Sequence, residues 1–216
     1  MVLKLYGSPM STCTRRVALT LKEKNVQYEL IAIDITKNEH KSASFVANQP
    51  FGQVPYIVEE DGFQLFESRA IARYIALKYA GQGNVVVPDP ADFKATALFE
   101  QAASIELTNF DPFASGLAAE KVFKPRKGLG PTDEQVVARL AAQLNAKLDA
   151  YEVILSKTKY LAGDNVTLAD LFHIPYGSML AVMGFDHLES DKRPNVVRWW
   201  KDITSRPSWQ AVKDGA

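Results

Sequence analysis

The sequence predicts an α/β domain over residues 1–80 and an all-α domain over residues 93–216, joined by a linker at 81–92. Two observations carry this prediction. Strand-like and helix-like periodicities alternate in the first third of the chain, whereas the rest shows helical periodicity without an alternating strand. Between them, glycine and proline cluster over residues 80–93, as they do in linkers. The first domain is therefore expected to have the order βαβ–ββα and the second to be a helical bundle.

The first elements form a strand–helix–strand unit. Residues 2–6 are predicted as a short buried strand, and residues 14–24 as a helix with Val17 and Leu21 on one face. Residues 26–35 alternate and are rich in β-branched side chains, which is typical of a second strand. Strand, helix and strand at this spacing favour parallel pairing and a right-handed crossover.

A hairpin and a helix complete this domain. Residues 56–66 are predicted as two short strands around Asp61-Gly62, a dipeptide typical of hairpin turns. Ser68 is then predicted to cap a helix with apolar residues at helical spacing. The stretch HKSASFVAN, residues 40–48, is expected to form a helical turn.

Helices account for the second domain. Residues 91–117 are predicted as helix, and residues 134–156 as a long amphipathic helix with apolar side chains in steps of three and four. Thr167 and Asp170 match a capping box that opens another helix, with Asp in place of the usual Glu or Gln. The stretch RWWKDITSRPSW is predicted as a short helix that stops before Pro207.

Charge and cysteine content narrow the classes of function. Of 216 residues, Lys and Arg number 25 and Asp and Glu number 25, so the chain lacks the basic field expected of a nucleic-acid-binding protein. No run of about 20 apolar residues predicts a membrane helix, and the start lacks a signal-peptide pattern. A single cysteine, Cys13, excludes an internal disulfide and a cysteine-based metal cluster. No metal is therefore predicted. The absence of a possible disulfide fits a reducing compartment, so a cytoplasmic location is predicted.

The turn between the first strand and helix is the first candidate binding feature. Ser11 lies where a helix begins, and unpaired N–H groups at such a place favour an anion. Its hydroxyl could donate a hydrogen bond to a bound oxyanion or thiolate. The competing interpretation is a plain N-terminal cap, for which serine is also preferred.

Two further features lie in the second half of this domain. Pro55 comes just before a predicted strand, and a cis bond to it would turn the N–H and C=O of Val54 outward to pair with a bound peptide. Glu67 and Ser68 lie at another helix start, where Ser68 suits a carboxylate and Glu67 an ammonium group; an ordinary cap is the alternative. Together with Ser11, these features suit a small zwitterionic peptide that carries a thiol.

The order of these motifs resembles the glutathione transferase family over essentially the whole chain. NQPFGQVP and FESRAI carry the resemblance to the superfamily, and STCTRRV with FDPFASGLAAEKVFKP that to the phi class. The resemblance implies a thioredoxin-like N-terminal domain and a helical C-terminal domain that contributes the hydrophobic substrate pocket. It also implies a cytoplasmic homodimer that acts in detoxification, with glutathione as co-substrate and no permanently bound cofactor.

The resemblance also implies roles for individual residues. Ser11 would be the catalytic hydroxyl, Phe51 would insert into the partner subunit, and Thr167 with Asp170 would serve folding. The glutathione contacts would be His40 and Lys41 for the glycine carboxylate, Gln53 and Val54 beside cis Pro55 for the peptide backbone, and Glu67 and Ser68 for the γ-glutamyl end. The pocket for the second substrate would comprise Met10, Ile35, Phe113, Leu117 and Tyr176.

These roles imply conjugation of glutathione to small hydrophobic electrophiles, with reduction of hydroperoxides as a further activity. A thiol attacks as its thiolate, and Ser11 with the helix start would stabilise that anion. One alternative is a thiol transferase that uses Cys13; another is a non-catalytic ligand carrier or interaction module. If the helix extends back to Cys13, this residue lies away from Ser11 at the edge of the face turned to the sheet, which favours a semi-buried structural cysteine.

Overall fold

The computed structural model describes residues 2–216, which divide into two compact units. Unit 1 comprises Met1–Val87 together with Arg206–Ala216, and unit 2 comprises Pro88–Ser205. Unit 1 contains every strand among the described residues, and unit 2 is helical. The predicted fold class, a thioredoxin-like domain with a helical domain, is confirmed.

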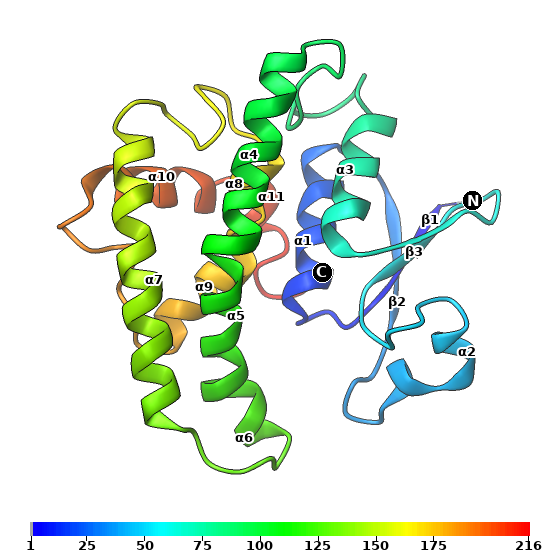
Figure 1. The fold of residues 1–216 in the computed structure, drawn as a ribbon. Helices are drawn as coiled ribbons and strands as arrows, with labels where there is room; N and C mark the ends of the chain where they lie inside the picture. Colours follow the sequence, from blue (N-terminus) through cyan, green and yellow to red (C-terminus); the bar gives the residue numbers. More distant parts are fainter. Residues whose placement is uncertain (1) are drawn as a thin grey trace. The chain divides into compact units, whose positions relative to one another are not determined.

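Unit 1 is built on a four-stranded sheet in the order β2-β1-β3-β4 (Figure 1). β1 (Leu3–Gly7) pairs in parallel with β2 (Tyr28–Ala32), and α1 (Thr12–Glu23) connects them. β3 (Tyr56–Val58) pairs antiparallel with both β1 and β4 (Gln64–Phe66). The structure therefore has the predicted strand–helix–strand unit and the predicted hairpin.

β2 ends earlier than the sequence predicts. The predicted strand runs to Ile35, but the last residue of β2 is Ala32. The carboxylate of Asp34 accepts hydrogen bonds from the backbone N–H and the hydroxyl of Thr36, at 2.9 and 2.6 Å. An aspartate that bonds the backbone two residues on forms a turn of its own, which stops the strand.

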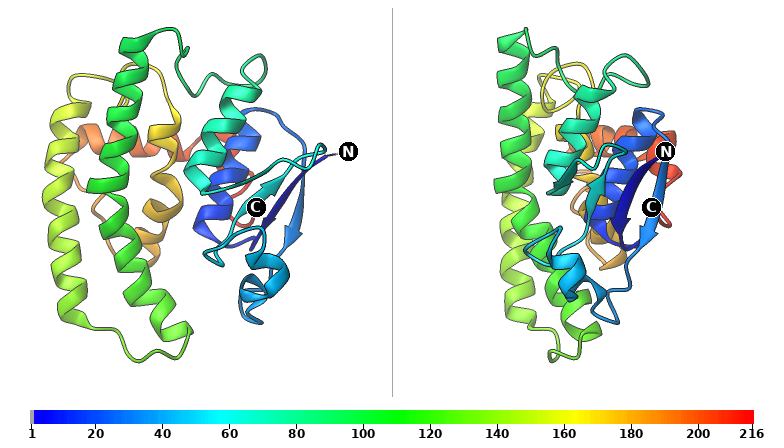
Figure 2. Two further views of the ribbon diagram at one scale, coloured as in Figure 1. Left: turned by 45° about the vertical axis from the view of Figure 1, so that its right-hand side comes forward. Right: turned by 90° about the vertical axis from the view of Figure 1, so that its right-hand side faces the viewer.

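Helices cover both faces of the sheet. α1 and α3 (Ser68–Lys78) lie side by side on one face, as Figures 1 and 2 show; α3 packs against β3, and Ile57 of β3 is fully buried. The predicted turn at 40–48 is a 3-10 turn, η1 (Glu39–Lys41), followed by α2 (Ala43–Val46). Phe45 of α2 packs edge-on against Tyr56, which alternates with Ile57 and therefore points to the opposite face.

The segment Arg206–Ala216 departs from the predicted domain boundary. The predicted helical domain runs to residue 216, but this segment groups with unit 1, and its helix α11 (Pro207–Gln210) packs against α1. The physical reason is burial of Trp209, which is only 4% exposed, together with an ion pair between Arg206 and Glu23. Helical periodicity alone does not say which domain a short helix joins.

Unit 2 contains the remaining helices. They are α4 (Phe93–Asn109), α5 (Asp111–Ala118), the π-helical turn η2 (Ala119–Phe123), α6 (Lys124–Arg126), α7 (Glu134–Leu155), α8 (Leu168–Leu171), α9 (Ile174–Val182) and α10 (Pro194–Thr204). α5 packs against both α7 and α9. The capping box predicted at the start of α8 is present.

The helix predicted over residues 91–117 is interrupted. Phe110 has φ −125° and ψ −59° and separates α4 from α5. Pro112 follows at the start of α5, where its missing N–H costs no hydrogen bond, whereas within one continuous helix it would remove one. The interruption therefore has a local cause that the apolar periodicity conceals.

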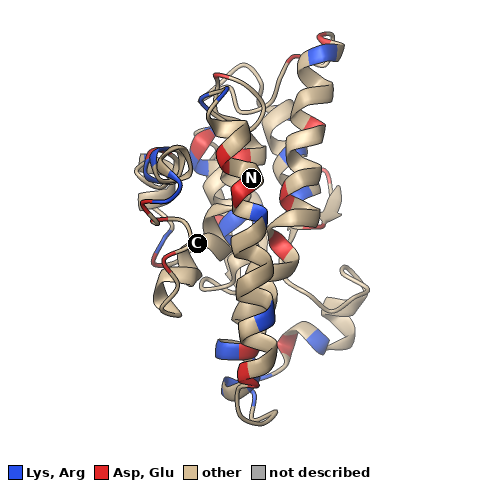
Figure 3. Ribbon diagram, turned by 60° about the vertical axis from the view of Figure 1, so that its left-hand side comes forward, with Lys and Arg blue, Asp and Glu red and all other residues tan. Residues whose placement is uncertain are grey.

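The charged residues of both signs are mixed along the helices. In the view of Figure 3, Lys and Arg as well as Asp and Glu occur along the visible helices. Across residues 2–216, no helix has both the length and the apolar character needed to cross a bilayer. Over the same range, no group of three or more His, Cys, Asp and Glu side chains is arranged to hold a metal ion.

Candidate functional site

Ser11 is the N-cap residue of α1. Its backbone is extended, with φ −66° and ψ 131°, and its Oγ accepts a hydrogen bond from the Thr14 N–H at 3.4 Å. This contact is long for a hydrogen bond and uses only a lone pair of the hydroxyl, so the proton of Ser11 remains for donation. The half-buried hydroxyl thus lies at a helix N-terminus, where negative charge is stabilised.

Cys13 lies inside α1, in its first turn. The helix begins at Thr12, two residues before the predicted start, and Cys13 is half-buried. Positions two apart on a helix differ by about 200°, so Cys13 points away from the side on which Ser11 lies. Its Sγ accepts a hydrogen bond from the Arg16 guanidinium at 3.4 Å.

Arg16 joins the starts of α1 and α3. Its side chain is 1% exposed, and the same Nη1 that contacts Cys13 donates to Ser68 Oγ at 2.9 Å. Ser68 accepts this bond and keeps its own proton to donate. The local sequence does not predict this contact, because the two residues are 52 positions apart.

Glu67, rather than the predicted Ser68, is the N-cap residue of α3. Ser68 is already the first helical residue, and Glu67 makes no capping bond with its side chain. Glu67 has φ +70° and ψ 106°, a conformation that a non-glycine residue adopts only at a cost of about 1–3 kcal/mol. Strained backbone of this kind is common at ligand-binding positions, and the side chain of Glu67 is exposed.

The loop before β3 contains the Val54–Pro55 peptide bond, which is cis. Pro55 is buried, Val54 is half-buried and the side chain of Gln53 is exposed. The backbone N–H of Gln53 donates to the side chain of Gln49 at 3.0 Å. Gln49 is buried and thus holds the loop from within, a role that the sequence analysis did not assign.

His40 and Lys41 lie against the same loop. Lys41 Nζ donates to the backbone carbonyl of Phe51 at 3.1 Å. A Cβ on Gly52 would lie 2.9 Å from both the His40 carbonyl and Lys41 Nζ, and Gly52 has φ +59°. Glycine is therefore needed at position 52 for the close approach of η1 to this loop.

The predicted glutathione contacts thus form two groups within unit 1. One group lies at the starts of α1 and α3, where Arg16 links the first turn of α1 to Ser68. The other consists of His40 and Lys41 against the 51–53 loop.

The residues predicted for the second substrate are found in both units. In unit 1, Met10 is 60% exposed next to Ser11, and Ile35 is half-buried after β2. In unit 2, Phe113 on α5 and Tyr176 on α9 are half-buried. Leu117 has no exposed surface and belongs to the core, unlike the pocket residue that the sequence analysis expected.

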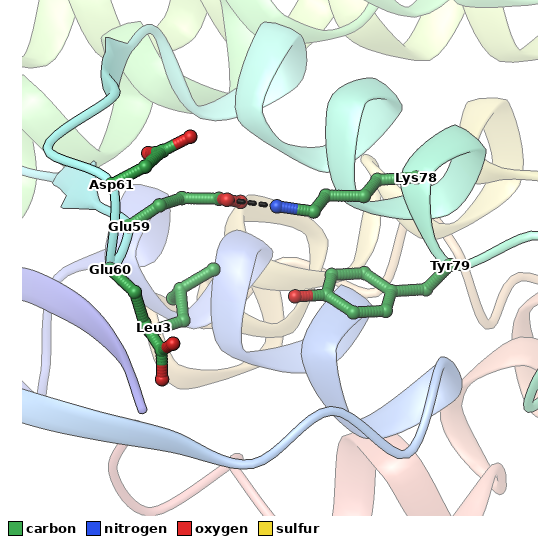
Figure 4. Close-up of a pocket in the computed structure, with 6 residues that line it drawn as sticks. All are labelled: Leu3, Glu59, Glu60, Asp61, Lys78 and Tyr79. Atoms are coloured by element: carbon green, nitrogen blue, oxygen red, sulfur yellow. Dashed lines mark hydrogen bonds and ion pairs between the residues drawn. The ribbon is translucent and has the colours of Figure 1, made fainter. Parts of the chain in front are cut away.

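A separate pocket in unit 1 has a volume of about 410 Å³ (Figure 4). It is lined by Leu3, Glu59, Glu60, Asp61, Lys78 and Tyr79. The Glu59 carboxylate accepts a hydrogen bond from Lys78 and raises the pKa of this lysine. None of the predicted glutathione contacts lines this pocket, so it is distinct from the candidate site.

Comparison with known proteins covers both units. Residues 1–77 match the family described as "Glutathione S-transferase, N-terminal domain", and residues 110–207 match "Glutathione S-transferase, C-terminal domain". The chain is 50% identical to "Glutathione S-transferase PM239X14" of Arabidopsis thaliana, with 91% of this chain and 89% of that protein covered. It is 44% identical to "Glutathione S-transferase hmp2" of Hypomyces subiculosus, with 97% and 96% covered.

A solved structure shows the same similarity in three dimensions. The crystal structure of glutathione transferase F7 from Populus trichocarpa matches with a TM-score of 0.91 at 40% identity. The match covers 99% of this chain and 98% of that one.

Proposed function

The chain belongs to the phi class of the glutathione S-transferase family and is an enzyme of that kind, and on this premise we propose that Ser11 stabilises the thiolate of bound glutathione. The observation that carries the proposal is the hydroxyl of Ser11 at the N-terminus of α1 with its proton uncommitted. The nucleophile is then the glutathione sulfur, because a thiol attacks as its thiolate.

The energy required lies within reach of a serine. Lowering a thiol pKa by about two units takes about 2.7 kcal/mol. A hydrogen bond to a charged group contributes about 1.5–3 kcal/mol, and a helix N-terminus adds about 0.3–1 kcal/mol. Acceptance of the Thr14 N–H bond polarises the Ser11 hydroxyl in the direction that favours donation. Ser11 therefore needs no partner base and keeps its proton throughout.

The remaining contacts divide between the two ends of glutathione. The glycine carboxylate is proposed to bind His40 and Lys41, whose approach to the 51–53 loop supports this assignment. The peptide backbone is proposed to pair with Val54 in the manner of an added strand, next to Gln53. The γ-glutamyl carboxylate is proposed to accept from Ser68 at the start of α3, while Glu67 takes the ammonium group.

The second substrate is proposed to be a small hydrophobic electrophile. In unit 1, Met10 presents an exposed apolar side chain directly before Ser11, and Ile35 follows β2. The contributions of Phe113 and Tyr176 in unit 2 stay predictions. Reduction of hydroperoxides by the same thiolate is proposed as a second activity. Glutathione is the co-substrate, and no permanently bound cofactor enters the proposal.

Assembly and location are proposed on separate grounds. Phe51 is 64% exposed and packs edge-on against Phe66 with ring centroids 6.2 Å apart, so a partner subunit of a homodimer has an aromatic anchor to bind. A cytoplasmic location is proposed because the single cysteine suits a reducing compartment.

The direct test is the pKa of the thiol of bound glutathione. A pH titration of the ultraviolet absorbance of the thiolate, in the complex of glutathione with the purified protein, gives this value. Ser11→Ala is expected to lower the thiolate fraction at neutral pH by about 4- to 25-fold. An unchanged pKa in Ser11→Ala would overturn the proposed role.

A further inference from the structure

The 206–216 segment runs beside α1 and contacts both of its ends. Figure 1 shows this segment, coloured red, next to α1 in blue, and α11 packs against α1. Both belong to unit 1. The proposed function depends on Ser11 at the start of α1, so the contacts of this segment at that end link it to the proposed function.

At the far end of α1 the segment is fixed by Glu23. The Glu23 carboxylate is fully buried and accepts two hydrogen bonds from Arg206, from Nε at 2.6 Å and from Nη2 at 2.7 Å. Ser208 Oγ and Asn84 Nδ2 donate to the same carboxylate. This paired arrangement is strong and directional, and it anchors the segment before it turns toward Ser11.

At the near end the segment holds Arg15. Arg15 Nη1 donates to the backbone carbonyl of Lys213 at 2.7 Å, and its guanidinium lies over the ring of Trp209, 5.5 Å from the centroid. Arg15 and Trp209 are both buried. The backbone N–H of Arg15 donates to the Ser11 carbonyl at 2.9 Å, so Arg15 closes the helical turn that Ser11 begins.

The segment also holds the turn that precedes Ser11. The backbone N–H of Ala216 donates to the carbonyl of Pro9 at 3.1 Å. Pro9 lies inside a turn that is closed by a hydrogen bond from the Ser11 N–H to the Ser8 carbonyl at 3.0 Å. Ser11 is therefore fixed on both sides, through Pro9 before it and through Arg15 after it.

We propose that residues 209–216 are a positioning element that holds the Ser11 hydroxyl in place for the glutathione sulfur. The inference rests on the proposed role of Ser11. A hydrogen bond weakens steeply with distance and angle, and a functional group has to be held within about 0.5 Å of its productive position. Contacts at Pro9 and Arg15 restrain the turn without touching the substrate, so their loss displaces Ser11 rather than removing it.

The test removes one backbone donor. Ala216→Pro eliminates the N–H that holds Pro9, whereas the matched control Ala216→Ser keeps it. A second variant, Trp209→Leu, removes the aromatic face beneath Arg15 and keeps an apolar side chain there. For each full-length variant, the readouts are the thiol pKa of bound glutathione, kcat and KM for conjugation, and the melting temperature.

The expected result is a functional loss out of proportion to the loss of stability. Ala216→Pro and Trp209→Leu are expected to lower the thiolate fraction at neutral pH by about 3- to 10-fold, with a matching fall in kcat and little change in KM for the electrophile. Ala216→Ser is expected to match the wild type. If Ala216→Pro does not fold, Trp209→Leu decides by the same readouts.

A lower melting temperature with an unchanged thiol pKa in both variants would overturn the inference, because the segment would then serve stability alone. Failure of the proposed function looks different. In that case Ser11→Ala itself leaves the thiol pKa unchanged. If Ser11→Ala changes the thiol pKa strongly and neither segment variant changes it, only the positioning role is rejected.

Discussion

Arg16 Nη1 donates to Ser68 Oγ at 2.9 Å and to Cys13 Sγ at 3.4 Å, so a single buried guanidinium ties the first residue of α3 to the first turn of α1. Both helix starts are proposed to bind glutathione, one at its sulfur and the other at its γ-glutamyl carboxylate. The distance between the places proposed for the sulfur and for the γ-glutamyl carboxylate is therefore coupled to this contact.

Arg16→Met is expected to weaken glutathione binding. The variant leaves Ser68 Oγ without its donor and costs about 1–3 kcal/mol of stability. KM for glutathione is expected to rise by about 10-fold while KM for the electrophile stays near the wild-type value. Steady-state kinetics with each substrate varied in turn check this, and an equal rise in both KM values would contradict it.

Ser11→Ala and Cys13→Ala separate the two enzyme hypotheses. Ser11→Ala is expected to lower kcat/KM for conjugation of glutathione to a chloronitrobenzene by about 10- to 100-fold, because the thiolate loses a charge-assisted hydrogen bond. Cys13→Ala is expected to change it by less than about 2-fold, since Cys13 points away from Ser11. Loss of a disulfide-exchange activity in Cys13→Ala, from a wild type that shows one, would instead support the thiol transferase.

Glu23 is expected to make unit 1 sensitive to acid. Burial by itself would raise the pKa of Glu23, but hydrogen bonds from Arg206, Ser208 and Asn84 outweigh it and hold the pKa below the ordinary value of 4.5. A carboxyl whose pKa is lowered in the folded state stabilises that state fully above the unfolded-state pKa. This stabilisation is lost as the pH falls below about 4.5 and through the folded-state pKa.

Glu23→Gln tests this dependence. The variant leaves Arg206 without its charged partner and is expected to lower the free energy of unfolding at pH 7 by about 2–4 kcal/mol. This cost is smaller than that of breaking a fully buried ion pair, because Arg206 is partly exposed. The difference between variant and wild type should shrink as the pH falls below about 4.5. Urea denaturation at several pH values checks it, and a difference independent of pH would contradict it.

Asp170→Ala is expected to destabilise unit 2. The buried Asp170 carboxylate accepts from the N–H of Leu161 at 3.0 Å, from Trp199 Nε1 at 2.9 Å and from the N–H of Thr167 at 2.8 Å. Removal of this acceptor leaves buried donors unpaired and is expected to cost at least about 3 kcal/mol. The melting temperature of Asp170→Ala is compared with that of Asp191→Ala, a control at an exposed position. An equal loss in both variants would argue against the capping role of Asp170.

Phe51→Ala is expected to weaken the homodimer. Truncation of a buried aromatic anchor at an interface typically costs about 2 kcal/mol or more, which shifts the dissociation constant by about 30-fold or more. Phe63→Ala, at another exposed phenylalanine of unit 1, is the matched control. Sedimentation at several concentrations checks both, and a wild type that sediments as a monomer would end the proposal.

Local patterns predicted most of the elements but few of the contacts between them. The hairpin at Asp61-Gly62 and the capping box at Thr167 depend on residues that are close in sequence, so periodicity and turn chemistry suffice to find them. The packing of Trp209 on Arg15 joins residues far apart in sequence. Because a buried tryptophan suits almost any helical core, its presence does not indicate which helix it packs against. Long-range pairing of this kind is not encoded in a local pattern.

The candidate site shows the same division. Ser11 stands out because a serine before a helix has a local meaning. The strained backbone of Glu67 has no sequence signal, since the surrounding structure imposes it. Gly52 and Gln49 were also missed, because their roles depend on the approach of η1 and on the folding of the loop over Gln49.

The Glu23 carboxylate receives hydrogen bonds from both sides of the break between units, from Asn84 before the chain enters unit 2 and from Arg206 just after it returns. In topological terms, unit 2 is an insertion in unit 1, and the two segments of unit 1 that flank the insertion both donate to one side chain, Glu23. A version of unit 1 that keeps both flanking segments is therefore an internal deletion of residues 88–205 closed by a short peptide. A truncation at residue 87 would instead leave Glu23 buried without Arg206 and expose the face of α1 that Trp209 covers.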